Sequence, residues 1–139
     1  MFVPRTVRDF GELVMLFNEK QLAMRVDSEQ QIVDLGPTRL QWDAHHPYLH
    51  FTRAIATMPP ECTSAVERMI AAQNHAAQFP MLDFDASTGT LAGRMTALVL
   101  VDGVRVDVIE AILAAIDANI DEMREQVAAI EDLTPSRAR

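Results

Sequence analysis

An apolar seam near the C-terminal end constrains the fold of this chain more than any other feature. Between residues 104 and 132, large apolar side chains recur alternately four and three residues apart, which is the spacing of one face of an α-helix. Such a face is stable only when it is buried against another element or another chain. The sequence therefore predicts a long C-terminal helix that packs on the rest of the fold. Its seam consists of Ile109, Leu113, Ile116, Ile120, Met123, Val127 and Ile130.

The other faces of this predicted helix are strongly acidic. Eight carboxylates and two arginines give residues 104–132 a formal charge of −6, and the whole 139-residue chain carries −8. A surface of this sign repels polyanions. We therefore expect direct nucleic-acid binding to be disfavoured.

The N-terminal region predicts a first helix over residues 7–21. Thr6 is placed to cap an unpaired backbone N–H, and Asp9 brings negative charge to the first turn, near the positive end of the helix dipole. The apolar face consists of Phe10, Leu13, Val14 and Phe17.

Residues 22–58 alternate between apolar and polar side chains, which is typical of strands. We predict a strand over 22–27 and another over 48–58. Between them, residues 31–35 and 39–43 are interrupted by Gly36-Pro37. They form either one bent strand or two short ones.

The second half of the chain predicts a middle helix and a hairpin. Pro59-Pro60 suits a helix start, because proline has no N–H to leave unpaired in the first turn, and the helix is expected to reach about Gln78. Strands are expected over 81–85 and 90–101, with a turn at Asp102-Gly103.

In chain order these elements read α-β-β-β-α-β-β-α. Runs of consecutive strands favour an α+β fold, with an antiparallel five-stranded sheet flanked by helices. A length of 139 residues suits one domain, which we expect over residues 1–132, followed by a flexible tail over 133–139.

Three features point to a cytoplasmic protein. Cys62 is the single cysteine, so no intrachain disulfide can form. The apolar runs are shorter than the roughly 18 residues that a bilayer crossing requires. The first residues also lack the continuous apolar stretch of a signal peptide, and we expect no membrane association.

A histidine-rich turn is the first candidate for chemistry. His45, His46 and His50 follow Asp43 closely, and imidazole with carboxylate is a set that zinc or nickel can use. Neighbouring His45 and His46 point to opposite sides in an extended chain, whereas metal ligands must converge. We therefore favour an ordinary turn over a metal site.

Two further candidates have simple structural interpretations. Asp83 and Asp85 share one strand face and could divide acid and base roles, but a solvated outer face of a half-buried strand is the favoured interpretation. Cys62 lies near a helix start, yet His75 is about 20 Å further along the same predicted helix. We interpret Cys62 as a buried packing residue and Asn74 as a structural residue that bridges backbone near the helix end.

Several of these features together resemble the YbjN-like family, whose fold is similar to that of type III secretion chaperones. The resemblance rests on the order of elements, on Asn74, on Phe79-Pro80, and on Leu82-Asp83-Phe84-Asp85 before the hairpin and the acidic helix. It covers roughly residues 6–132. It implies a homodimer that holds other protein chains, without catalytic residues or a cofactor.

The middle helix is the expected dimer contact. Its many alanines allow a close approach, and one two-fold contact would set this helix against its own copy. Eight methionines also supply adaptable apolar side chains for binding other proteins. The expected contact consists of Cys62, Val66, Met69, Gln73 and Ala76.

The sequence therefore predicts a non-enzymatic adaptor or chaperone-like module that acts as a homodimer. Two alternatives stay open. The first is a regulatory accessory protein of nucleic-acid metabolism that acts through a DNA-binding protein partner. The second is a small metal-dependent enzyme that uses His45, His46 and His50.

Overall fold

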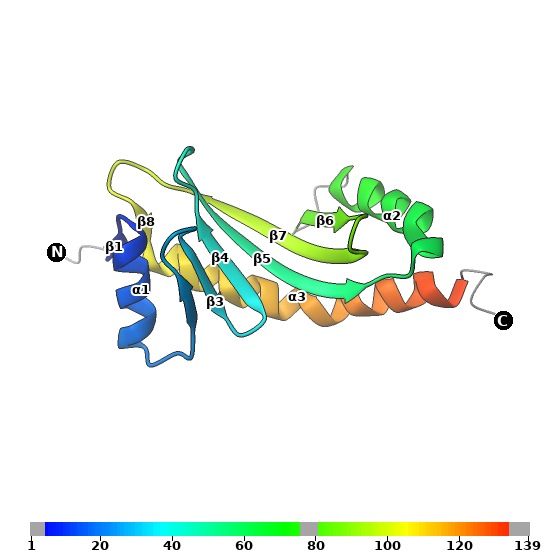
Figure 1. Ribbon diagram of the computed structural model, residues 1–139, viewed down its shortest axis with the longest axis horizontal. Coiled ribbons are helices and arrows are strands. Elements are labelled where there is room, and N and C mark those ends of the chain that lie inside the picture. The colour runs from blue at the N-terminus through cyan, green and yellow to red at the C-terminus, as the bar shows by residue number, and fades with distance from the viewer. Residues whose placement is uncertain (1–4, 76–80, 134–139) are drawn as a thin grey trace. The chain divides into compact units, whose positions relative to one another are not determined.

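The structure is a computed structural model that describes residues 5–75 and 81–133 (Figure 1). It contains three α-helices and a short 3-10 helix: α1 (Phe10–Glu19), η1 (Pro60–Cys62), α2 (Thr63–His75) and α3 (Val106–Leu133). The strands are β1 (Thr6–Val7), β2 (Arg25–Asp27), β3 (Ile32–Leu35), β4 (Thr38–Trp42), β5 (Tyr48–Thr57), β6 (Met81–Asp85), β7 (Thr90–Leu98) and β8 (Val104–Arg105).

The predicted α+β class is confirmed, but the prediction of a five-stranded sheet is wrong. The larger sheet has six strands in the order β2-β3-β4-β5-β7-β6, and β1 pairs with β8 in a separate two-stranded sheet. The pairs β2-β3, β3-β4, β6-β7 and β1-β8 are all antiparallel. The element order therefore begins with a strand and differs from the predicted one.

The sixth strand comes from the interruption at Gly36-Pro37. Gly36 has a φ of 59°, a left-handed conformation that glycine adopts without strain, and Leu35 pairs directly with Thr38. Of the two predicted alternatives, two short strands are therefore observed. An ion pair of 2.8 Å between Arg39 Nε and Asp34 Oδ1 joins them.

The start of the first helix also differs from the prediction. Asp9, not Thr6, is the N-cap of α1, and its Oδ1 accepts a hydrogen bond of 2.9 Å from the Glu12 N–H. Thr6 lies in β1, where it pairs with Arg105. Strands of two residues, such as β1 and β8, are too short to show a periodic pattern, so they could not be predicted.

The chain divides into two compact units. The first unit comprises residues 1–52 and 95–114, and the second comprises residues 53–94 and 115–139. The first unit buries side chains from α1, from β3, β4, β5 and β7, and from the beginning of α3, including Leu13, Phe17, Leu40, Phe51 and Ile109.

The second unit has its own apolar core, and α2 packs against β6 beside it (Figure 1). Burial of apolar side chains in such a core is the main source of stability for a folded unit. The core consists of Ile55, Met58, Cys62, Val66, Leu82, Leu91, Ile120, Met123 and Val127.

The predicted seam of α3 is confirmed over most of its length. Five of its seven members are buried, whereas Leu113 is half-buried and Ile112 is buried beside it. The side chain of Ile130 lies outside the described residues. The predicted tail began at Leu133, but this residue still belongs to α3, and residues 134–139 lie outside the described residues. The buried members of the seam are Ile109, Ile116, Ile120, Met123 and Val127.

None of the helices within residues 5–75 and 81–133 is long and apolar enough to cross a bilayer.

Replacement of Ile116 by aspartate tests the role of the seam. Ile116 is fully buried, so Ile116→Asp places a charge without a partner in an apolar site. We expect the free energy of unfolding, measured by urea denaturation, to fall by roughly 3 kcal/mol or more. Ala118→Asp, on an exposed position of α3, is the matched control and should change it little. Equal stability of the two variants would show that the seam does not support the fold.

Candidate protein-binding surface

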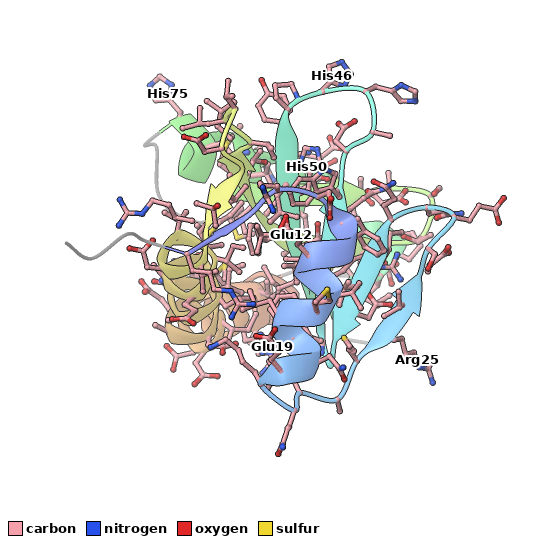
Figure 2. All side chains as sticks on the ribbon, turned by 90° about the vertical axis from the view of Figure 1, so that its left-hand side faces the viewer. Glu12, Glu19, Arg25, His46, His50 and His75 are labelled. Atoms are coloured by element: carbon pink, nitrogen blue, oxygen red, sulfur yellow. The ribbon has the colours of Figure 1, made fainter. Side chains whose placement is uncertain are left out.

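The histidine turn of the first unit is organised by one carboxylate. Asp43 Oδ1 accepts hydrogen bonds from the backbone N–H groups of His45 and His46, at 2.8 and 3.1 Å. Asp43 Oδ2 lies 3.3 Å from both His46 Nδ1 and His50 Nε2. Figure 2 shows His46 at the outer end of the turn and His50 nearer the sheet. Both oxygens of Asp43 are thus engaged within the turn.

These contacts lower the pKa of Asp43 from 3.8 to about 2. The backbone N–H of His45 is the largest cause, followed among the favourable ones by the His50 ring, the His46 N–H and the charge of His46, while burial opposes them. The group is therefore a carboxylate at all but the most acidic pH. Its role in the turn is that of a permanent hydrogen-bond acceptor.

His50 also connects the turn to strand β7. Its Nδ1 lies 3.3 Å from Thr96 Oγ1, and β5 and β7 are neighbours in the sheet. A threonine hydroxyl, an imidazole and a carboxylate that contact one another in this order are the groups of a nucleophilic triad. Cross-strand pairing on neighbouring strands accounts for the contact, so we assign it a structural role.

The turn does not form a metal site among the residues that the structure describes. No group of three His, Cys, Asp or Glu side chains there has an arrangement that could hold a metal ion. His46 and His50 approach the same carboxylate oxygen, whereas His45 joins the network through its backbone N–H.

The two aspartates of β6 lie where the sequence predicted them. Asp83 and Asp85 are exposed, whereas the alternating Leu82 and Phe84 are buried and half-buried in the second unit. Asp85 Oδ1 accepts hydrogen bonds from Ser87 Oγ at 2.6 Å and from the Ser87 N–H at 3.0 Å. These bonds lower the pKa of Asp85 and hold the turn that leads into β7. Asp85 therefore shapes the β6–β7 turn.

The predicted structural role of Asn74 is confirmed. Its Nδ2 donates to the Leu82 carbonyl and its Oδ1 accepts from the Leu82 N–H, both at 3.0 Å. The side-chain amide thus pairs with β6 as a neighbouring strand would. Because β6 is the edge strand of the larger sheet, Asn74 occupies backbone groups that another chain could otherwise use.

The predicted dimer contact on the middle helix needs correction. Cys62 and Val66 have exposed fractions of 0% and belong to the core of the second unit, and Met69 packs against that core half-buried. Cys62 and Val66 are therefore not available to a second subunit, because this face of the helix turns inward. The side chain of Gln73 and all of Ala76 lie outside the described residues.

Exposed apolar side chains gather instead in the first unit. The described residues include nine large apolar side chains that are exposed, and only Met81 belongs to the second unit. The other eight are Met15, Leu22, Val26, Tyr48, Leu98, Leu100, Val101 and Val108. Scattered exposed apolar residues are common, whereas neighbouring ones mark an interaction surface, so those that follow one another closely in the chain are the informative ones.

The most exposed of these side chains belong to one turn, residues 98–103, which we call the apolar hairpin. Leu98 and Leu100 are 55% and 63% exposed, and Val101 is fully exposed. Sequence analysis placed a strand and a turn here but missed the exposure. The available signal was the uninterrupted apolar run from Leu98 to Val101, since a strand with one buried face needs only every second residue to be apolar.

Backbone contacts hold the apolar hairpin in place. Leu100 and Gly103 exchange hydrogen bonds of 3.2 and 2.9 Å, and the Val99 N–H donates to the Pro47 carbonyl at 2.7 Å. Gly103 has a φ of 93°, and a Cβ at this position would collide with the Val7 carbonyl oxygen. Only glycine therefore fits, and the exposed side chains project from a fixed turn.

Comparison with known proteins assigns no family to this chain. Neither the protein-family models nor the curated protein sequences give a match. The resemblance to YbjN-like proteins therefore stays a prediction, and the function must be argued from the geometry.

Replacement of Asp43 by asparagine tests the histidine turn. A folded-state pKa below the ordinary value means that the carboxylate adds stability above about pH 4, and that this is lost as the pH falls toward 2. The wild type should therefore exceed Asp43→Asn in unfolding free energy at neutral pH, and the margin should shrink as the pH falls from about 4 toward 2. Chemical denaturation across this range measures the margin. Asp102→Asn, in an exposed turn, is the control for the lost charge, and a margin that stays unchanged down to about pH 2 would contradict a lowered pKa of Asp43.

Proposed function

We propose that this chain is a non-enzymatic protein-binding module, an adaptor or chaperone-like protein that works as a homodimer. The observation that carries the proposal is the uneven distribution of exposed large apolar side chains: of the nine among the residues that the structure describes, eight lie in the first unit. Single exposed apolar residues are common on any protein. Their concentration on one unit and on one fixed turn favours a contact surface.

The polar groups of the first unit support the same proposal. Asp43 is engaged by the histidine turn, and Asp34 is paired with Arg39. Two further acidic groups of this unit, Glu12 and Asp107, are also paired with arginines. Carboxylates that are held in ion pairs and turn hydrogen bonds stabilise the fold, whereas a catalytic carboxylate must be able to exchange a proton with a bound substrate. Protein binding therefore fits the first unit better than catalysis.

The charge of the chain favours a protein partner over a nucleic acid. Twenty acidic residues stand against twelve basic ones, and the unpaired acidic excess repels phosphate. A contact made by apolar side chains tolerates this charge, because its stability comes from the apolar surface that leaves water.

The solution mass and a binding comparison test the proposal. Light scattering after size-exclusion chromatography should give twice the chain mass of 15.5 kDa at micromolar concentration. Chemical crosslinking in native extract should then yield reproducible adducts with other proteins. A monomeric mass throughout the micromolar range, together with salt-sensitive DNA binding by the pure protein, would contradict the proposal and favour a nucleic-acid role.

A further inference from the structure

A polar hollow of the first unit is formed by the β2–β3 turn, the end of β4 and the histidine turn. It measures about 390 Å³, a size typical of sites for small ligands. Its lining includes two carboxylates, three side-chain amides, two imidazoles and one indole ring. None of the described lining residues is a lysine or an arginine. The hollow therefore has acidic groups without a basic side chain among them.

The charge of the hollow selects the sign of a ligand. Glu29 and Asp43 each bring one negative charge, and the side chain of Glu29 lies in an exposed turn. Asp43 stays ionised, because the hydrogen bonds that it accepts lower its pKa to about 2. Backbone N–H groups and neutral imidazole rings engage its oxygens without cancelling its charge. A cation is therefore attracted to this hollow, and an anion is repelled.

The indole ring of Trp42 supplies a second feature that favours a cation. The negative face of an indole attracts a positive charge placed above it. Trp42 is half-buried, and its backbone N–H donates to the Gln31 carbonyl at 3.0 Å, which ties two walls of the hollow together. The side-chain oxygens of Gln31 and Gln41 can accept hydrogen bonds from a bound N–H group. A neutral sugar can also use the ring and the amides, but it gains nothing from the two negative charges.

The backbone of Gln31 points to a use for its side chain. Its φ is 56°, a left-handed conformation that is uncommon for residues other than glycine. Gln21 has a similar φ of 58°, but it follows the end of α1, where a left-handed residue commonly terminates a helix. Strained residues of this kind gather at ligand sites. A glutamine at a position where glycine would be less strained favours a role for its amide in the hollow.

We propose that this hollow is a binding site for an alkylammonium group. Glu29 and Asp43 supply the opposite charge, and Trp42 supplies the ring face. The side-chain oxygen of Gln31 accepts a hydrogen bond from the bound ammonium. A lysine side chain of another protein and a free small amine both offer this chemistry. The site goes beyond the proposed function and depends neither on the homodimer nor on the apolar hairpin.

Trp42 is the only tryptophan of the chain, so its fluorescence reports directly on the hollow. We expect putrescine, added at constant ionic strength and about pH 8, where imidazoles are mostly neutral, to change the emission in a saturable way. Half-saturation is expected at about millimolar concentration, as befits so small a ligand. The four-carbon diol of the same length has no charge and should leave the emission unchanged. N-acetyl-lysine amide identifies the source: binding tighter than that of putrescine indicates a lysine side chain, and weaker binding indicates a free amine.

Three variants test the residues of the site. Glu29→Gln removes one charge at an exposed position and should weaken putrescine binding about threefold or more. Asp102→Asn removes the same charge from an exposed turn outside the hollow, and should bind like the wild type. Gln31→Gly should weaken binding while its stability in urea is maintained or raised, because glycine relieves the left-handed strain. A glutamine with only a structural role would leave the affinity unchanged.

Three results would overturn the proposal. The first is the absence of a saturable change both in the fluorescence of Trp42 and in the NMR signals of its indole and of the His45 ring. The second is binding of the diol as tight as that of putrescine, or tighter binding of methyl glucoside, which would indicate a site for neutral ligands. The third is an equal loss of affinity in Glu29→Gln and Asp102→Asn, which would indicate unspecific attraction of cations to a chain of charge −8.

Discussion

The buried face of α3 is the interaction on which the rest of the structure depends. Ile109 and Ile112 are buried in the first unit, and Ile120, Met123 and Val127 belong to the apolar core of the second unit. One helix thus supplies apolar surface to both cores, and its acidic faces stay in water. This division keeps most of the negative charge on solvent-exposed faces, which repel other anions.

Several other groups of the molecule are also used within the fold. Asn74 pairs with both backbone groups of Leu82 on the edge strand β6. The apolar side of α2 packs into the core of the second unit. Asp43 organises the histidine turn and Asp85 the β6–β7 turn. Leu98, Leu100 and Val101 of the apolar hairpin are exposed, which is why we propose this turn as part of a contact surface.

The sequence predicted those features that depend on local periodicity or on a single turn. The seam of α3, the bridging role of Asn74 and the outer position of Asp83 were found in this way. The interpretation of Cys62 as a buried packing residue is confirmed, but the sequence does not distinguish burial within one chain from burial between chains. Val66 was therefore assigned to a dimer contact, whereas the structure places it in the core of its own unit. The uninterrupted apolar run from Leu98 to Val101 indicates that some of these side chains are exposed, but which of them are exposed depends on how the turn is held against Val7.

Amide hydrogen exchange tests most directly whether the first unit is the contacting part of the molecule. Exchange would be compared between a dilute sample and one concentrated enough to associate, with mass spectrometry to locate the changes. The account predicts slower exchange at high concentration in peptides that cover the apolar hairpin and β1, with little change in α2. Slower exchange confined to α2 or to the second half of α3, with an unchanged hairpin, would contradict it.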